Sequence, residues 1–349
     1  MQTIDLSVII PAYNRTDLLK YTLESVKRAI KNLTIEIILV DDGSDVPLED
    51  QLGDYKELPI VFIRQTNKGL VFAKNTGLTS AKGEFIQYLD SDDLVHEDKF
   101  VSQLAAMRES GADMSYCDTA FVRLEGNYNN LIIETSNHQT SSSNNPTACY
   151  LQIGLAPHSP IFRRSYLLQY LLKPLIAPNQ IYNPIGEIWI YYNLAPYPAT
   201  IIKVDGEFAI INKDFDGERI TKRWEKMAIA SAAMSYAFAR YCQPAPANLH
   251  TRQLAWLAAL DTLRRLPSNF SKTIDEVFIK ALKRLSKPGN KALTGGKLFK
   301  SLSLLIGPVR TAILFRSLLR PSYTDPGNSS ISRNELQELE KQLINYVKS

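Results

Sequence analysis

The 349 residues carry 45% hydrophobic and 22% charged side chains and a formal net charge of +4, a composition typical of a globular protein that can bury a large core. The three cysteines, Cys117, Cys149 and Cys242, are far apart and odd in number, which excludes a disulfide framework and a zinc pattern and fits a reducing cytoplasm. The N-terminus has no basic stretch before its short apolar run, and eighteen consecutive apolar residues occur nowhere, so we expect neither a signal peptide nor a membrane span.

The first ninety residues alternate between apolar runs and helical patterns. Four apolar runs are predicted strands: LSVII (6–10), IEIILV (35–40), IVFI (60–63) and EFIQYL (84–89). Helical spacing covers residues 17–30 and 69–83. Nearly all-apolar strands separated by helices indicate an α/β fold with a mostly parallel sheet covered on both faces, in which ligands bind at the carboxyl ends of strands.

The remainder of the chain has a different pattern. Residues 136–147 are rich in Ser and Asn and predict a mobile loop. From about residue 216 the pattern is helical to the end, punctuated by prolines. We therefore expect a first domain over residues 1–212 and a helical C-terminal region over residues 213–349.

Polar clusters follow three of the predicted strands directly. They are PAYNR (11–15), DDGSD (41–45) and DSDD (90–93). Because the carboxyl ends of parallel strands lie at one edge of a sheet, these clusters should converge there on a shared site rather than form separate solvated turns.

The DSDD cluster places Asp90, Asp92 and Asp93 immediately after a strand. One of these residues could cap the helix expected near His96, but a cap uses a single acid. Mg²⁺ and Mn²⁺ take oxygen ligands, often one or two carboxylates completed by phosphates and water. The cluster therefore predicts a site where a metal ion bridges to a diphosphate, with Asp92 and Asp93 as its ligands.

The two preceding clusters suit a nucleoside. An acid of the pair at 41–42 can accept a hydrogen bond from a nucleobase imide or a ribose hydroxyl, and Tyr13 offers a flat ring on which a base can lie. A half-exposed packing role for Tyr13 is the alternative.

The segments SVIIPAYNR, EIILVDDGSD and TNKGLVFAKNTGLTSAKGEFIQYLDSDD resemble, in order and spacing, the signatures of family 2 glycosyltransferases. These are inverting enzymes with the GT-A fold, which binds nucleotide-diphospho-sugars. The resemblance covers about the first hundred residues. It implies that Pro11, Tyr13 and Asp42 hold the base and ribose, and that Asp90, Asp92 and Asp93 form the site for Mn²⁺ or Mg²⁺ and the diphosphate.

Lys74 is a departure from that family, which often has Arg at the corresponding position. An ammonium group can meet a phosphate, but without the two-pronged geometry of a guanidinium. We expect Lys74 on the donor side of the site.

An inverting transfer needs a base that removes the acceptor hydroxyl's proton. In the resembled family this acid lies near the start of a helix about a hundred residues beyond the aspartate cluster, and the segment 183–195 implies Glu187 for the role. Glu187 is also the sole acid between Glu134 and Asp205. A first-turn Glu favoured by the helix dipole alone is the alternative.

Two further features surround this candidate. Trp189, Tyr191 and Tyr192 could form an apolar wall beside Glu187, or simply a core face of the helix. His158 lies upstream of this helix, where the resembled family brings a loop toward the acceptor and the diphosphate. A contact with donor or metal and a purely structural role both remain open for His158.

The resemblance also divides the first domain, with residues 1–118 as the nucleotide-sugar half and 119–212 as the acceptor-side half. In the C-terminal region, residues 277–324 carry ten Lys or Arg and no Asp or Glu. Such basic amphipathic helices pack on the first domain, bind a partner or lie on an anionic membrane surface. Nucleic acid is not expected, because no binding motif accompanies the charge.

The sequence therefore predicts a metal-dependent glycosyltransferase that moves sugar from a UDP-sugar to a glycan or glycolipid acceptor in bacterial surface or extracellular polysaccharide synthesis. The expected location is cytoplasmic, peripheral to the inner face of the plasma membrane. Two alternatives stay open, a catalytically degenerate membrane-surface scaffold and a sugar-nucleotide pyrophosphorylase. A dinucleotide oxidoreductase is disfavoured because the sequence has no Gly-x-Gly.

Overall fold

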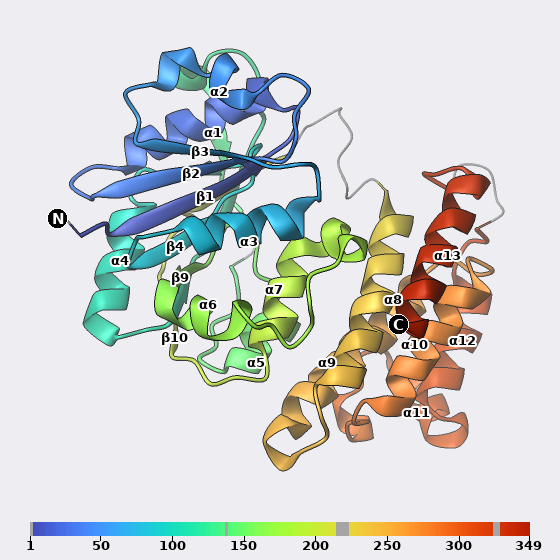
Figure 1. The fold of residues 1–349 in the computed structure, drawn as a ribbon. Coiled ribbons are helices and arrows are strands. Elements are labelled where there is room, and N and C mark those ends of the chain that lie inside the picture. Colours follow the sequence, from blue (N-terminus) through green and yellow to red (C-terminus); the bar gives the residue numbers. More distant parts are fainter. Residues whose placement is uncertain (1–2, 137–138, 214–222, 324–328) are drawn as a thin grey trace. The chain divides into compact units, whose positions relative to one another are not determined.

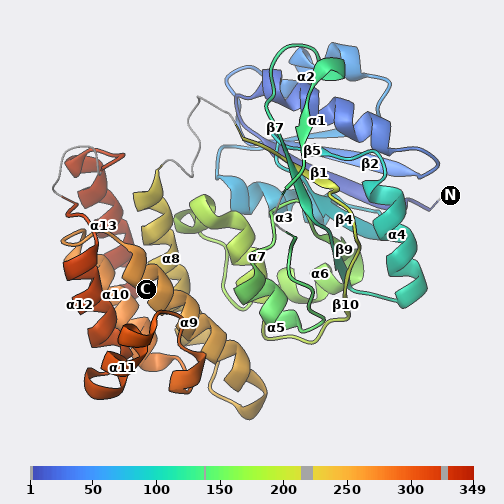
Figure 2. The same ribbon diagram turned by 180° about the vertical axis from the view of Figure 1, so that it is seen from behind.

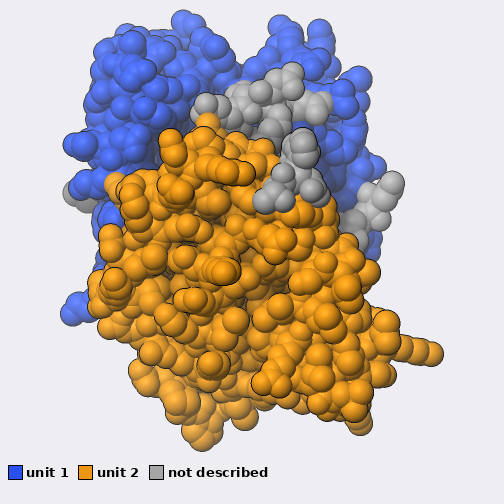
Figure 3. Space-filling model, turned by 90° about the vertical axis from the view of Figure 1, so that its right-hand side faces the viewer, with its two compact units in different colours: residues 1–174, 197–217 blue, residues 175–196, 218–349 orange. Residues whose placement is uncertain are grey.

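The computed structural model describes residues 3–136, 139–213, 223–323 and 329–349. The chain forms two compact units, coloured separately in Figure 3. Unit 1 comprises residues 1–174 and 197–217, and unit 2 comprises residues 175–196 and 218–349.

Unit 1 is built on a seven-stranded, mostly parallel sheet (Figure 1). The strand order is β10 (Ile201–Lys203), β6 (Met114–Tyr116), β9 (Ile161–Arg163), β4 (Phe85–Tyr88), β1 (Leu6–Ala12), β2 (Ile35–Asp41) and β3 (Ile60–Arg64). Strand β9 runs antiparallel to both of its neighbours, and the other pairs are parallel. The four strands expected from the first ninety residues are thus confirmed as β1 to β4.

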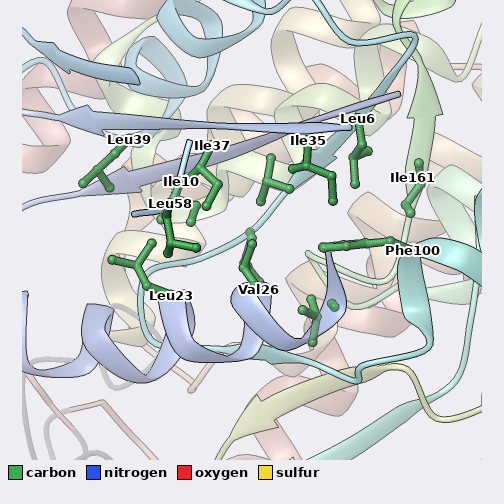
Figure 4. Packing of buried hydrophobic residues seen from close by; sticks show 14 of the residues in the cluster. Leu6, Ile10, Leu23, Val26, Ile35, Ile37, Leu39, Leu58, Phe100 and Ile161 are labelled. Atoms are coloured by element: carbon green, nitrogen blue, oxygen red, sulfur yellow. The ribbon is translucent and has the colours of Figure 1, made fainter. Parts of the chain in front are cut away.

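Helices cover both faces of this sheet. On one face lie α1 (Thr16–Ala29) and α4 (Lys99–Ser110), whose side chains join one apolar core with the strands (Figure 4). Leu23 and Val26 of α1 point toward the strands in that view, and Leu23 lies beside Leu58. Their helical spacing places them on one face, and burying each stabilises the fold by about 1.5–3 kcal/mol.

The opposite face of β1 carries α3 (Leu70–Ser80). A Cβ at Gly77 would lie 2.3 Å from Cγ2 of Ile9, so only glycine allows the helix to approach the strand this closely. Because side chains alternate along a strand, Ile9 faces α3 while Val8 and Ile10 face the core of Figure 4. The remaining helices of unit 1 are α2 (Leu48–Gln51), α5 (Pro146–Ala148) and α6 (Arg164–Leu171).

A second, four-stranded sheet completes unit 1 (Figure 2). Its order is β5 (Leu94–Val95), β11 (Ala209–Asn212), β7 (Thr119–Val122) and β8 (Ile133–Glu134). Strand β5 follows the DSDD cluster directly and pairs with β11 through Leu94 and Ile210. The end of β11 is thereby brought beside the acidic loop.

Unit 2 is helical. Its helices are α7 (Gly186–Leu194), α8 (Trp224–Tyr241), α9 (Leu249–Arg265), α10 (Lys272–Arg284), α11 (Lys297–Ile306), α12 (Pro308–Leu319) and α13 (Arg333–Lys348). The expected helical C-terminal region is confirmed over the described residues. No helix among them is long and apolar enough to cross a bilayer.

The division into units differs from the expected one at residues 175–196, which we placed in the acceptor-side half of the first domain. This segment packs with the C-terminal helices. The Tyr192 ring meets Phe238 of α8 edge-on with centroids 5.0 Å apart, and Tyr182 meets Tyr346 of α13. Large aromatic side chains on α7 and the turn before it therefore belong to the core of unit 2.

The segment expected as a mobile loop, residues 136–147, is described except for residues 137–138, which lie outside the described residues. Residues 139–145 have no regular structure, and Pro146 opens the short helix α5. The side chain of Asn145 caps that helix by accepting a hydrogen bond from the Ala148 amide at 3.0 Å.

Candidate active site at the strand ends of unit 1

The loops after β1, β2 and β4 meet at one edge of the sheet. The Asn14 amide donates to Oγ of Ser44 at 3.0 Å, and its side-chain amide donates to Asp45 at 3.1 Å. Nη1 of Arg15 donates to Oδ2 of Asp92 at 3.0 Å. The convergence expected from the strand-end rule is therefore present, and each of these contacts joins residues far apart in the sequence.

Tyr13 stands at this edge with 45% of its surface exposed, and the neighbouring Pro11 is buried in β1. A half-exposed ring on a buried strand end is available to stack on a planar ligand. The structure places the residue at the converging loops and leaves its role as a stacking platform a prediction.

The two neighbouring acids at the end of β2, Asp41 and Asp42, have different hydrogen-bond partners. Asp41 accepts hydrogen bonds from the amides of Ser44 and Leu48 and pairs with Nη1 of Arg64 at 2.7 Å. Burial raises the pKa of Asp41, but the bonds from Ser44 and Leu48 and the Arg64 charge outweigh burial, so its pKa lies below the usual range. Asp41 is a structural carboxylate that closes the turn after β2.

Asp42 is the acid expected to contact the nucleoside. Its carboxylate accepts from the Gln65 side chain at 2.7 Å, from the Lys68 amide at 3.0 Å and from the Gly69 amide at 2.7 Å. It therefore holds the loop that leads into α3. A carboxylate has about four acceptor positions, so Asp42 keeps room for a ligand hydroxyl or imide besides these three bonds.

The turn between these loops requires glycine at position 43. Gly43 has a φ of +82°, and a Cβ there would lie 2.8 Å from the amide nitrogen of Asn67. Both the left-handed backbone and the close approach exclude a side chain. The glycine thus lets the β2 loop pack against the loop that Asp42 holds.

Lys74 reaches the edge from α3. It is 1% exposed, its Nζ lies 3.3 Å from Oδ1 of Asp90, and it stands over the ring of Tyr88 at 5.7 Å from the centroid. The ammonium is thereby fixed at the start of the DSDD cluster. Its expected role on the donor side of the site remains a prediction.

Asp92 and Asp93 are both buried, at 9% and 6% exposure. The carboxylate of Asp92 faces Arg15, whereas Oδ1 of Asp93 accepts from the Asn212 amide at 2.9 Å. The alternative that one of them caps the next helix is wrong, because α4 begins at Lys99 and Asp98 occupies the cap position.

His158 is fully buried beside these acids. Its Nδ1 lies 3.2 Å from Oδ2 of Asp93, yet neither ring nitrogen has a hydrogen bond with adequate geometry to any described residue. The imidazole therefore lies close to the Asp93 carboxylate without a hydrogen bond to it. Buried polar atoms normally find a partner, so the two nitrogens mark a place where the site is incomplete.

The loop that carries His158 is anchored from α4 by a buried polar cluster. Nζ of Lys99 donates to the Ser159 carbonyl at 2.8 Å and lies 3.6 Å from Sγ of Cys117. Burial lowers the pKa of Lys99, and the nearby Cys117 sulfur opposes that shift. This lysine holds the backbone next to His158.

Sequence reasoning did not assign roles to Arg15, Lys99 or Asn212. Arg15 belongs to the PAYNR cluster, so its place in a strand-end motif was a usable signal. Lys99 lies on an ordinary helix, and Asn212 acts through its backbone amide at the end of β11, so nothing in the residue pattern identifies them.

The donor set fits a divalent cation in its chemistry. Asp92 and Asp93 follow the same strand, and the unsatisfied imidazole of His158 lies beside Asp93. Two carboxylates with a diphosphate and water are enough for Mg²⁺ or Mn²⁺. Within the described ranges, no group of three or more His, Cys, Asp or Glu is arranged to hold a metal ion by itself. A metal here would therefore depend on ligands from the substrate.

Glu187 lies in unit 2, in the first turn of α7, and is partly buried. Trp189 donates its indole N–H to the Ile176 carbonyl at 3.0 Å, and Tyr192 packs on Phe238. The core-face interpretation of this aromatic stripe is thus confirmed for Trp189 and Tyr192. The donor-side residues all lie in unit 1.

The mostly parallel sheet with acidic loops at its strand ends, followed by a helical C-terminal region, is a GT-A-like arrangement. The sequence signature described as glycosyl transferase family 2 matches residues 7–171. Residues 7–171, a little less than half of the chain, are therefore similar to glycosyl transferase family 2.

Curated relatives share this part of the chain. An uncharacterized glycosyltransferase of Haemophilus influenzae is 35% identical over 131 residues, which are 36% of this chain and 52% of that protein. Chondroitin synthase of Pasteurella multocida is 30% identical over 154 residues, 42% of this chain and 16% of that protein. The chain thus spans about half the length of the first relative and less of the second.

Solved structures show the same fold over more of the chain. S. aureus TarS residues 1–349 match with a TM-score of 0.61 and 16% identity, over 90% of each chain. The same fragment in complex with UDP matches with a TM-score of 0.61 and 15% identity, also over 90% of each chain. At this identity the likeness concerns the fold.

Proposed function

We propose that this protein is an inverting glycosyltransferase that moves a sugar from a UDP-sugar to a hydroxyl of a glycan or glycolipid acceptor in bacterial surface or extracellular polysaccharide synthesis. The observation that carries the proposal is the edge of unit 1 where the loops after β1, β2 and β4 are joined by Asn14–Ser44 and Arg15–Asp92. Support for the donor comes from TarS, whose fragment of the same fold was solved with UDP and with UDP-GlcNAc. Support for the pathway comes from a relative named chondroitin synthase.

The nucleoside would lie at the ends of β1 and β2. The exposed ring of Tyr13 offers the base a flat surface, Pro11 shapes the strand end beneath it, and the spare acceptor position of Asp42 suits an imide N–H or a ribose hydroxyl. A pyrimidine with an N–H donor, such as uracil, matches an acidic acceptor here.

The diphosphate would lie over the end of β4. Asp92 and Asp93 are the proposed ligands of Mn²⁺ or Mg²⁺, with Asp90 and His158 beside them, and the bound cation would offset charge on the departing diphosphate. Lys74 adds a positive charge, fixed there by Asp90. Arg15 and the Asn212 amide orient Asp92 and Asp93.

Glu187 is the proposed base, on sequence grounds alone. As a partly buried acid at a helix start it could accept the proton of the acceptor hydroxyl. Replacing Glu187 by Gln should lower turnover by about a hundredfold or more while donor affinity changes little. Equal loss of donor affinity and turnover would argue against this role.

A donor panel tests the proposed function directly. The full chain is heated with UDP-, GDP- and dTDP-sugars, with and without Mn²⁺, because a ligand bound to the folded state raises the melting temperature. We expect a UDP-sugar to give the largest rise, and the rise to depend on the metal. If no nucleotide-sugar raised the melting temperature, the proposal would be refuted.

The two alternatives give different outcomes in the same set of assays. A transferase releases UDP from a UDP-sugar when acceptor is supplied, whereas a pyrophosphorylase consumes a nucleoside triphosphate and a sugar phosphate. A scaffold would bind donor without turnover across a wide acceptor screen.

A further inference from the structure

Two consecutive helices of unit 2 form a hairpin with an unusual surface. Helix α11 (Lys297–Ile306) and helix α12 (Pro308–Leu319) are joined at Gly307, and the rings of Phe299 and Phe315 meet edge-on between them with centroids 5.4 Å apart. The inner sides of the two helices are thus occupied by each other and by unit 2. We call residues 297–320 the hairpin.

The outer sides of the hairpin expose large apolar side chains. Leu298 and Leu305, seven positions apart on one face of α11, are 72% and 81% exposed. Leu318 and Leu319 at the end of α12 are both 71% exposed, and Leu304 is 67% exposed. Single exposed leucines are common on proteins, but such a concentration within 24 residues marks an interaction surface.

Basic side chains are interleaved with these leucines. Among the hairpin's five Lys and Arg, Arg316 forms a two-pronged ion pair with Asp275 of α10 at 2.6 and 2.9 Å. The other four are exposed: Lys297, Lys300, Arg310 and Arg320. Throughout the described parts of the chain, no carboxylate forms an ion pair with any of these four.

On each helix of the hairpin, basic and apolar side chains share a face. Lys297, Lys300 and Leu304 share a face of α11 at helical spacing, and Arg310, Leu314 and Leu318 share a face of α12. At the end of α12, Arg320 and Arg264 of α9 line a hollow of about 310 Å³ with Phe315 and Leu319. A negatively charged group entering this hollow would meet a guanidinium and an apolar wall at once.

We propose that the hairpin is a docking surface for a bilayer that contains anionic phospholipid. The exposed leucines would enter the boundary between headgroups and acyl chains, and the four unpaired cations would meet lipid phosphates. The hairpin would lie in the interface, because the described residues include no helix able to span a membrane. This inference goes beyond the proposed function and does not depend on it.

Charge complementarity favours this occupant over two others. A second copy of the chain docking face to face would bring the same unpaired cations together, which is repulsive. Nucleic acid would match the charge but offers no apolar partner for leucines that protrude from a folded surface. Anionic lipid satisfies both features of the hairpin.

Vesicle co-sedimentation of the full chain tests the proposal. One vesicle preparation is phosphatidylcholine alone, and the other is phosphatidylcholine mixed with phosphatidylglycerol. We expect sedimentation with the mixed vesicles only, and a marked decrease when NaCl is raised from about 0.1 M to about 0.5 M. Equal binding to both preparations, or to neither, would overturn the proposal.

Two sets of variants locate the surface. The charge set replaces Lys297, Lys300, Arg310 and Arg320 by Gln, and the apolar set replaces Leu298, Leu305 and Leu318 by Ser. The charge set should weaken partitioning by at least about a hundredfold, since each basic side chain near an anionic surface favours binding about fivefold. The apolar set should also release the protein from vesicles.

The matched control removes the same number of exposed positive charges from other helices of unit 2. It replaces Lys272, Arg333, Lys341 and Lys348 by Gln and should retain most of the vesicle binding. A control that loses as much binding as the charge set would show a nonspecific charge effect and overturn the proposal. Unchanged melting temperatures exclude misfolding, and a dimer that the apolar set dissociates, without vesicle binding, would assign the surface to a second copy.

Discussion

Charged side chains are arranged in opposite ways at the strand-end edge of unit 1 and on the hairpin of unit 2. At the edge, Asp42, Asp92 and Asp93 are buried, and each accepts a hydrogen bond or an ion pair from a residue distant in the sequence. On the hairpin, Lys297 and Arg310 are exposed, and neither pairs with an acid in the part of the chain that the structure describes. Buried, paired charges determine local geometry and are costly to remove, whereas exposed, unpaired charges cost little to remove and remain available to a partner.

We expect the largest effect from substitutions at the edge of unit 1, at Asp92 and Asp93. Replacing either by Asn keeps the size of the side chain but removes the negative charge proposed to hold the cation and diphosphate. We expect turnover to fall by about a hundredfold or more, because a bound metal contributes several kcal/mol at the transition state. Initial rates of UDP release over a range of Mn²⁺ concentrations would measure the loss, and unaltered rates in both variants would count against the site.

A substitution at Asp42 tests whether the edge also contributes to the stability of the fold. Changing Asp42 to Ala leaves three donors from Gln65, Lys68 and Gly69 without their acceptor. We expect the free energy of unfolding to fall by about 2–4 kcal/mol. Asp45 to Ala is the matched control, since Asp45 is exposed and, among the described residues, forms hydrogen bonds with Asn14 alone. Urea denaturation should show a loss below about 1 kcal/mol for this variant.

Arg316 of α12 and Arg320, which directly follows that helix, allow the same comparison within unit 2. Arg316 is 5% exposed and holds Asp275 with both guanidinium nitrogens, whereas Arg320 is exposed. Arg316 to Gln should destabilise the fold by about 1–3 kcal/mol, because Asp275 loses its charged partner. Arg320 to Gln should change stability by less than about 0.5 kcal/mol. Similar melting temperatures for both variants would contradict the distinction between paired and free cations.

Replacing Asp41 should have a smaller effect on stability, and that effect should depend on pH. Its pKa in the folded protein is depressed, so its contribution to stability is complete above its unfolded pKa of about 3.9 and is lost as the pH falls through the lower, folded value. Asp41 to Asn should be less stable than the parent protein at pH 7 by about 1 kcal/mol, and this difference should shrink below about pH 4. Melting temperatures of both proteins from pH 7 to pH 2 would measure it, and a constant difference would refute the assignment.

Much of the edge could be predicted from residue order alone. A strand that is apolar on both faces and ends in acids places those acids at a known edge of a parallel sheet, and this reasoning located Tyr13, Asp42, Asp90, Asp92 and Asp93. It could not identify the partners of these acids. The Asn212 amide lies 119 positions from Asp93, and its approach depends on how β11 pairs with β5 in the second sheet.

The sequence by itself determined the alternation of strands and helices, the strand-end position of the acids and the basic, amphipathic character of residues 297–320. These features depend on local spacing and composition, which the chain carries wherever it folds. Only the tertiary structure decided that Asp41 is structural while Asp42 holds the loop before α3, that residues 175–196 pack with the C-terminal helices, and which cations of the hairpin are paired. These outcomes depend on contacts between residues distant in sequence, and such contacts are selected by packing and hydrogen bonding in the folded state.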